Sequence, residues 1–160
     1  MEKELIELLR DNARISVEEI AARLDAKVDE VEELIRSLEQ RRIIRGYKAV
    51  INDDELEDVP VKAIIEVRIT PQREGGFDKV ARRIAKFEEV TDVYLISGGY
   101  DLKLEVHGKS LHEIAMFVSS RLATIDGVIS TATHFVLKKY KESGTLLENE
   151  EEYERLRVSP

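Results

Sequence analysis

The stretch that most constrains this chain is Val90–Gly108, VTDVYLISGGYDLKLEVHG, which predicts two strands folded back on each other. Apolar and charged residues alternate from Leu102 to Val106, and this is the period of a half-buried strand. Gly98 and Gly99 lie between the arms and permit the positive φ that hairpin turns commonly need. The same glycines leave backbone N–H groups unscreened, so the turn can also receive a carboxylate. A plain turn and an anion-binding loop both fit this dipeptide.

The hairpin is the middle of a longer pattern, residues 61–140, with the order strand, helix, strand, strand, helix, strand. The first strand is expected over Val61–Thr70, before Pro71, and the last over Val128–Tyr140. Two βαβ halves joined by a hairpin define an α+β, βαββαβ ferredoxin-like sandwich with helices on one sheet face. The expected apolar helix positions are Phe77, Val80, Ala81, Ile84 and Phe87 in the first helix and Leu111, Ile114, Ala115, Val118 and Leu122 in the second.

The other face of such a sheet is left bare by this layer arrangement. A bare sheet face is covered most simply by the same face of another copy. We therefore expect a homodimer at least.

Residues 1–44 carry three stretches with helical spacing of apolar residues. Ser16 and Glu19 form a capping-box pattern, and Ile15 and Ile20 occupy the positions of a hydrophobic staple. A capped short helix, a tight turn and a longer helix are typical of the helix-turn-helix that enters the major groove. A small helical core without this role fits the spacing equally well. A strand is expected over residues 45–52, and it could pair with a partner chain.

Composition indicates the domain boundaries and excludes disulfide-bonded and membrane-spanning proteins. Residues 53–60 hold five acidic residues and no basic one, so we expect domains over 1–52 and 61–140, an acidic linker, and a tail over 141–160. The net charge is −8 and no segment is strongly basic. The absence of cysteine excludes disulfides, and no apolar run is long enough for a membrane span, so a cytoplasmic protein without membrane partners is expected. No metal-ligand cluster or cofactor loop is predicted.

The helix-turn-helix, the linker strand and a βαββαβ domain with Gly-Gly-Tyr-Asp at its hairpin together resemble the Lrp/AsnC family of transcription regulators over residues 1–140. The most specific matching pieces are residues 38–52, the hairpin Ser97–Asp101 and the strand segment Ser130–Thr133. The resemblance implies a winged-helix-like domain that binds double-stranded DNA and a C-terminal domain that binds a free amino acid. It also implies dimers that assemble further, from tetramers to octamers, with the ligand between dimers.

The resemblance also implies where the amino-acid effector binds. A zwitterion needs donors for its carboxylate, which glycine N–H groups and threonine hydroxyls supply, and an acceptor for its ammonium, which Asp101 or nearby carbonyls supply. Threonines in a strand also fit an ordinary preference of β-branched residues for strands. The implied effector-binding residues are Gly98, Gly99, Tyr100, Asp101, Thr131 and Thr133.

The third helix departs from the pattern of the family. Small, hydroxylated and basic residues are common there in relatives, whereas this helix starts with Asp29-Glu30-Val31-Glu32-Glu33, and carboxylates oppose binding to phosphates. Arg42 also stands where relatives often carry glycine. A solvated helix face with Glu32 and Arg36 paired is the alternative interpretation. The expected DNA-binding residues are Lys27, Asp29, Glu33, Arg36, Gln40, Arg41 and Arg42.

The sequence is also compatible with two functions other than transcription regulation. One is a ligand-binding scaffold that has lost DNA binding, which the acidic third helix suggests. The other is a haem-precursor decarboxylase, because chains of this kind also occur as such enzymes. Its candidate residues would be His107, His112 and His134, but they are scattered singly along the sequence. We therefore expect a transcription regulator rather than an enzyme.

Overall fold

A computed structural model describes residues 1–71 and 73–148 of the chain, which divides into two compact units. The first unit spans Met1–Ile51 and the second begins at Asn52. No helix among the described residues is both long and apolar enough to cross a membrane.

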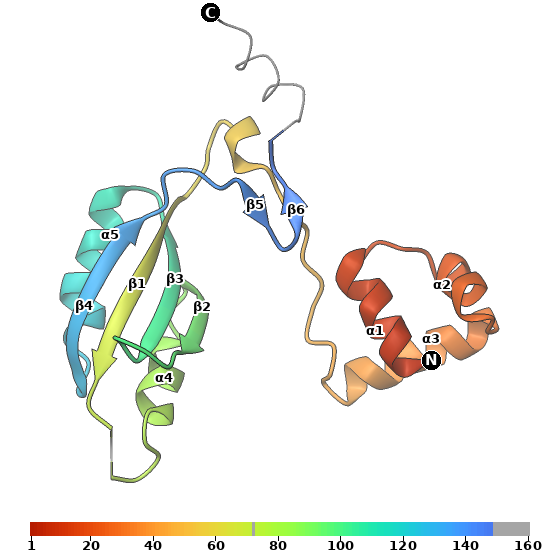
Figure 1. Ribbon diagram of the computed structural model, residues 1–160. Helices are drawn as coiled ribbons and strands as arrows, with labels where there is room; N and C mark the ends of the chain where they lie inside the picture. Colours follow the sequence, from red (N-terminus) through yellow and green to blue (C-terminus); the bar gives the residue numbers. More distant parts are fainter. Residues whose placement is uncertain (72, 149–160) are drawn as a thin grey trace, which may run out of the picture. The chain divides into compact units, whose positions relative to one another are not determined.

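The first unit consists of α1 (Glu2–Asp11), α2 (Val17–Leu24) and α3 (Val28–Gln40), drawn in red to orange in Figure 1. Each helix is amphipathic and turns its apolar face towards a shared core. The buried residues of this core are Leu5, Ile20, Ala21, Val31 and Leu38. Val28, the first residue of α3, lies outside this core and is 37% exposed.

The start of α2 follows the capping prediction in part. Ser16 Oγ accepts a hydrogen bond from the N–H of Glu19 at 3.1 Å, which satisfies one free N–H of the first turn. The carboxylate of Glu19 does not return to Ser16 but pairs with Arg23 at 2.5 Å. Ile15 and Ile20 pack in the same core, as a hydrophobic staple requires.

Acidic residues at the start of α3 stabilise the helix itself. The Glu30 carboxylate accepts a hydrogen bond from the N–H of Lys27 at 3.2 Å, and Asp29 lies in the same first turn. Negative side chains interact favourably with the positive end of the helix dipole. Part of the unusual acidity of this helix therefore has a local structural cause.

The strand expected over residues 45–52 is not formed within the described chain, where this segment has no ladder partner. A lone extended segment cannot satisfy its N–H and C=O groups by itself. Tyr47 is held instead by its side chain, whose hydroxyl donates to Glu39 at 2.9 Å.

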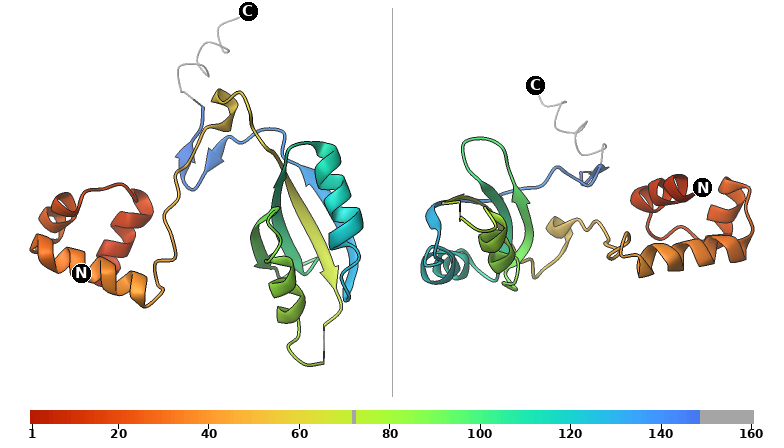
Figure 2. Two further views of the ribbon diagram at one scale, coloured as in Figure 1. Left: turned by 180° about the vertical axis from the view of Figure 1, so that it is seen from behind. Right: turned by 90° about the horizontal axis from the view of Figure 1, so that it is seen from below.

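The second unit is built on a four-stranded antiparallel sheet. Its strands are β1 (Val61–Ile69), β2 (Val90–Leu95), β3 (Leu102–Gly108) and β4 (Val128–Phe135), in the order β2-β3-β1-β4. The helices α4 (Asp78–Ile84) and α5 (Leu111–Phe117) lie on one face of this sheet (Figure 2). The predicted βαββαβ order is confirmed, and the arms of the central hairpin lie where the alternation predicts them.

Alternate residues of the central strands form the core under the two helices. Ile65 and Val67 of β1 face Leu104 and Leu102 of β3, and all four are fully buried. Burying such side chains stabilises the fold by about 1.5–3 kcal/mol each, as an upper estimate. The pairing of β1 with β3 therefore carries much of the stability of this unit.

The apolar face predicted for the second helix is partly wrong. Leu111 and Ala115 are exposed, whereas Ile114, Phe117 and Leu122 are buried. The helix changes after Phe117 into a π-helical turn, η2 (Val118–Leu122), with a bond from Ala123 N to Val118 O of 2.8 Å. The wider turn brings Leu122 to the same side as Phe117, so a strict 3.6-residue period fails there.

The open face of the sheet carries charges rather than a bare apolar surface. Cross-strand pairs on this face include Glu66 with Lys103, and Ile64 with Glu105. Three cationic and three anionic side chains share the face, namely Lys62, Arg68, Lys103, Glu66, Asp92 and Glu105. Any partner of this face must match mixed charges as well as shape.

The last strand is shorter than predicted, because β4 ends at Phe135 rather than at Tyr140. A small hairpin follows, formed by β5 (Lys141–Glu142) and β6 (Thr145–Leu146). Its turn has φ of 47° at Ser143 and 84° at Gly144, as a two-residue type I′ hairpin requires. The segment 141–160, expected as a tail, therefore begins with a hairpin at residues 141–146, and residues 149–160 lie outside the described part.

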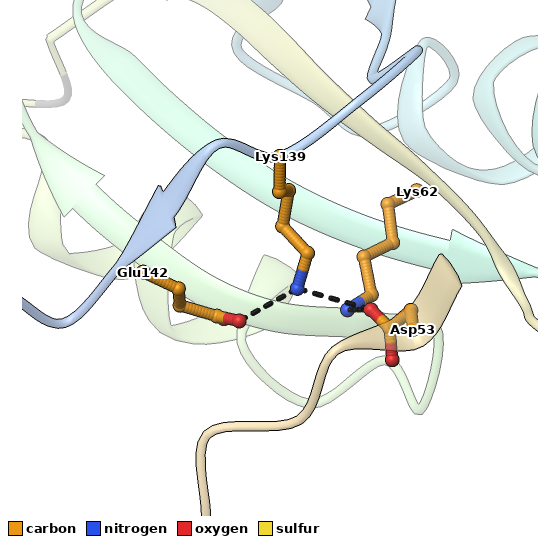
Figure 3. A network of polar contacts seen from close by, with 4 residues as sticks. All are labelled: Asp53, Lys62, Lys139 and Glu142. Carbon is orange, nitrogen blue, oxygen red and sulfur yellow. Dashed lines mark hydrogen bonds and ion pairs between the residues drawn. The ribbon is translucent and has the colours of Figure 1, made fainter. Parts of the chain in front are cut away.

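The hairpin is tied to the start of the second unit by ion pairs (Figure 3). Lys139 Nζ lies 2.6 Å from Glu142 Oε2 and 3.0 Å from Asp53 Oδ2, which also contacts Lys62 Nζ at 2.6 Å. Asn52 adds a hydrogen bond of 3.1 Å from its Nδ2 to Leu147 O. We call Asp53, Lys62, Lys139 and Glu142 the lysine–carboxylate cluster.

The ion pairs of the cluster persist over a wide pH range, because the pKa of its aspartate is lowered and the pKa of one of its lysines is raised. Hydrogen bonds from Lys62 and Lys139 lower the pKa of Asp53. Burial lowers the pKa of Lys139, but hydrogen bonds to Glu142 and Asp53 outweigh this effect and raise it. The contribution of Asp53 is present above about pH 4 and is lost as the pH falls through its lowered pKa. That of Lys139 is present below about pH 10 and is lost as the pH rises through its raised pKa.

The change Asp53→Asn should weaken the docking of the C-terminal hairpin by about 1–2 kcal/mol, because two lysines lose their shared carboxylate. Hydrogen exchange at the Leu147 amide, which donates to Tyr140 O in the native chain, should then become faster at neutral pH. Wild type should show the same loss of protection at the Leu147 amide when the pH falls below the lowered pKa of Asp53. The matched control is Asp54→Asn, because Asp54 is exposed on the same short turn. Equal exchange in wild type and Asp53→Asn would contradict this role.

Candidate functional site

The loop between β2 and β3 is one residue longer than the predicted turn at Ser97–Asp101. It spans residues 96–101 and is closed by a hydrogen bond of 2.8 Å from Ile96 N to Asp101 O. Gly98 has a φ of 156°, within the region that favours glycine, whereas Gly99 has no positive φ. Of the two glycines that permit positive φ, Gly98 therefore uses this freedom and Gly99 does not.

The two glycines leave the loop backbone open to solvent. Ser97, Gly98 and Gly99 are exposed, and a Cβ built on either glycine would meet no atom within 4 Å. Tyr100 is half-buried beside them. The loop therefore presents accessible backbone groups, but the glycines themselves are not walled in by this chain.

Asp101 is half-buried and turned towards β1 at the end of the loop. Its Oδ2 accepts a hydrogen bond of 2.8 Å from the N–H of Ile69, the last residue of that strand. The carboxylate predicted to receive an ammonium group is thus already an acceptor within the fold.

Thr131 and Thr133 lie apart from the loop in this chain. They pair with Val67 and Ile65 on the helix-covered side of the sheet, where both are half-buried. Strand β1 lies between β4 and β3, and two strand spacings of about 4.8 Å separate them by roughly 10 Å. The threonines and the glycine loop therefore belong to strands that are not neighbours, with β1 between them.

The outward face of α3 is accessible, as its helical spacing predicts. Asp29, Glu33, Arg36 and Gln40 are exposed, and Lys27 is exposed just before the helix. No hydrogen bond or ion pair of Arg36 is found among the described residues, so its guanidinium is available to an external partner.

Arg41 is less available than the sequence suggests. Its Nη1 and Nη2 contact the Glu2 carboxylate at 2.8 and 3.2 Å, so the pair is bidentate and joins the end of α3 to α1. The hydrogen bond lowers the pKa of Glu2 and raises that of Arg41. A phosphate would have to compete with this carboxylate.

Arg42 occupies a left-handed backbone position. It follows α3 with a φ of 58°, where the Cβ of an L-residue crowds the following carbonyl and glycine is preferred. The replacement of the family's frequent glycine therefore introduces local strain, together with a basic side chain beside the helix.

The three histidines do not form a common centre. His112 is exposed on α5, whereas His107 and His134 lie on the open sheet face on opposite sides of β1. The nearest carboxylate oxygen to His134 Nε2 is that of Glu66 at 3.8 Å, and both side chains are partly exposed. Their arrangement gives no nucleophile or general base aimed at a shared position. No group of three potential metal-binding side chains occurs among the described residues.

A cavity that the sequence did not predict lies at the opposite end of β3 from the glycine loop. It has a volume of about 760 Å³ and is lined by the end of β3, residues 57–60 and the first turn of α5. Acidic side chains dominate its wall, including Glu57, Asp58 and Glu88. These residues are scattered in the sequence and have no common spacing, so only the fold could reveal this cavity.

The fold is shared with solved transcription regulators. The structure of Escherichia coli AsnC matches with a TM-score of 0.66 at 21% identity, covering 92% of this chain and 96% of that one. A transcriptional regulator from Neisseria meningitidis, solved as a complex with L-Met, matches with a TM-score of 0.68 at 23% identity, covering 88% and 90% of the two chains. These likenesses define the class of fold.

The sequence comparisons identify the family. Residues 62–146 match the model of the Lrp/AsnC ligand binding domain. The HTH-type transcriptional regulator YugG of Bacillus subtilis (strain 168) is 44% identical over 160 residues, covering 99% of this chain and 96% of that protein. The chain belongs to the Lrp/AsnC family of transcription regulators. It is therefore a regulator rather than an enzyme, and the decarboxylase alternative is set aside.

The change Arg42→Gly should stabilise the first unit by about 1 kcal/mol, because glycine accepts the left-handed position without the Cβ clash. Slower hydrogen exchange in α3 of the full-length protein would report this gain. Arg45→Gly is the matched control, since Arg45 is an exposed neighbour without a positive φ and should gain nothing. An equal gain in both variants would point to charge rather than backbone strain.

Proposed function

We propose that this regulator reads DNA with the exposed face of α3 and binds an amino-acid effector at the glycine loop between β2 and β3. The observation that carries the effector proposal is the open backbone of Gly98 and Gly99 at the end of the β2–β3 hairpin. Exposed backbone N–H groups can donate to a carboxylate without obstruction by side chains.

The effector site requires more than one chain. Thr131 and Thr133 supply hydroxyl donors, but they lie about 10 Å from β3 across the sheet. A second copy that brings its own residues to the loop would complete the wall of the site. The L-Met complex of the Neisseria meningitidis relative supports an amino acid as the class of ligand. Binding would then alter the packing between dimers and so the spacing of the DNA-binding units.

A thermal-shift screen of the full-length protein against all proteinogenic amino acids tests the effector. A ligand present at one hundred times its Kd should stabilise the native state by about 2.7 kcal/mol and raise the unfolding midpoint. Each D-enantiomer serves as a control, because a site built from fixed donors distinguishes the hand of its ligand. A screen without any shift would remove the amino-acid effector from this proposal.

DNA recognition by α3 would depend on few basic side chains. Arg36 can donate to guanine, Gln40 can pair with adenine, and the carboxylates of Asp29 and Glu33 can accept from cytosine N4. Phosphate attraction is weak, because Arg41 is paired with Glu2 and α3 is acidic. A single unit should therefore bind weakly, and two units on a spaced operator should be needed.

The change Arg36→Ala should weaken binding to DNA from upstream of the protein's own gene by about 1–3 kcal/mol, if Arg36 contacts a base. The double change Glu32→Arg and Glu33→Arg should raise affinity for all DNA and steepen its dependence on salt. Gel shifts over a salt series measure both effects, with Arg23→Ala on α2 as a surface control. If neither wild type nor the double variant binds at low salt, the scaffold alternative without DNA binding is favoured.

We also infer that copies pair through the open sheet face of the second unit. The charges on this face are balanced in sign, so the same face of another copy can complement them. The segment 45–51 has no strand partner among the described residues and offers backbone groups that could add a second contact between copies. Dimers of this kind could associate further at the effector loops.

Light scattering at micromolar concentration should report a dimer or a larger assembly. The change Glu66→Lys should raise the dissociation constant of the dimer at least tenfold, because it unbalances the charges of the open face. Lys79→Glu on the exposed side of α4 is the control and should leave the assembly unchanged. A monomeric wild type would contradict both the dimer and the shared effector site.

A further inference from the structure

Asp101 makes three hydrogen bonds that join the glycine loop, residues 96–101, to the ends of β1 and β2. Its backbone N–H donates to Val67 O at 3.0 Å, and its carbonyl accepts from Ile96 N at 2.8 Å. Its side chain accepts from Ile69 N at 2.8 Å. One residue therefore connects the end of β1 with the end of β2.

The side-chain bond replaces a contact that the sheet no longer supplies. The pairing of β1 with β3 ends at Val67 and Leu102, but β1 continues to Ile69. The register of β1 with β4 shifts between Arg68 and Ile69, so the ladder is irregular at the same place. Ile69 is only 2% exposed, and a buried N–H without an acceptor is costly. The carboxylate of Asp101 provides that acceptor.

We propose that Asp101 is a positioning residue, which fixes the glycine loop against β1 and promotes effector binding through the geometry of that loop. The proposal rests on the effector site described above, and it assigns Asp101 a role other than that of counter-charge to the ligand's ammonium. Gly98 and Gly99 have no side chains in contact with the fold, so the ends of the loop determine their order. A loop that is already ordered loses less conformational entropy when a ligand binds.

Two variants separate the hydrogen bond from the charge. Asp101→Asn keeps an oxygen acceptor at the same distance from the backbone and removes the charge. Asp101→Glu keeps the charge but moves the oxygen by one methylene. Asp101→Ala removes both. If Asp101 positions the loop, the Asn variant should keep wild-type affinity for the effector. If Asp101 binds the ammonium group directly, the Glu variant should keep it instead.

Two measurements on the full-length protein test these variants. Amide exchange by NMR reports the anchor without any ligand, through Ile69 and the loop residues Gly98 and Gly99. We expect protection at Ile69 close to that of wild type in the Asn variant and exchange at least tenfold faster in the Ala and Glu variants. Calorimetric titration with the proteinogenic amino acids should show affinity within threefold of wild type for the Asn variant and at least tenfold lower for the other two.

Specific outcomes would overturn the proposal. Unchanged protection of Ile69 in the Ala and Glu variants would show that the anchor does not order the strand end. Loss of affinity in the Asn variant with Ile69 still protected would make Asp101 a direct ligand. If Asp101→Ala does not fold, the Asn and Glu variants decide between the two roles. If no amino acid binds wild type, the effector function fails, while exchange at Ile69, Gly98 and Gly99 still decides whether Asp101 positions the loop.

Discussion

The antiparallel pairing of β1 with β3 is the interaction on which the second unit depends. Seven consecutive cross-strand pairs join the two central strands, from Val61 with Gly108 to Val67 with Leu102. One face of these pairs forms the core under the helices, and the other presents charges. The same pairing fixes the position of the glycine loop at one end and of the acidic cavity at the other.

The main elements of this unit could be predicted because their periodicity is strong. Alternation from Leu102 to Val106 located β3, and Pro71 marked the end of β1 to within a residue of its observed end. The hairpin of β5 and β6 was missed because strands of two residues have no period, and Ser143-Gly144 was its only signal. The π-helical turn was missed because nothing in the residue types of 118–122 marks a change of helical spacing.

The candidate site was predictable in its residue types but less so in their roles. Gly98 and the exposed face of α3 lie as the patterns indicate. The sequence cannot reveal that Asp101 is turned towards Ile69 or that Arg41 is paired with Glu2, because both contacts join residues at least 32 positions apart. The role of Glu30 was also not predicted. In the sequence it is an acidic residue unfavourable for DNA binding, whereas in the fold it accepts a hydrogen bond from the N–H of Lys27.

If copies pair through the open sheet face as proposed above, its mixed charges bear on which chains can assemble together. A purely apolar face would adhere to the corresponding face of any chain with this fold. A patterned face instead discriminates, because a paralogue with a different order of acidic and basic side chains would place like charges together, at a cost of several kcal/mol. In a cell that makes several regulators of this architecture, Glu66, Lys103 and Glu105 would favour homo-oligomers over hetero-oligomers. Each regulator would then act without mixing its subunits with those of another.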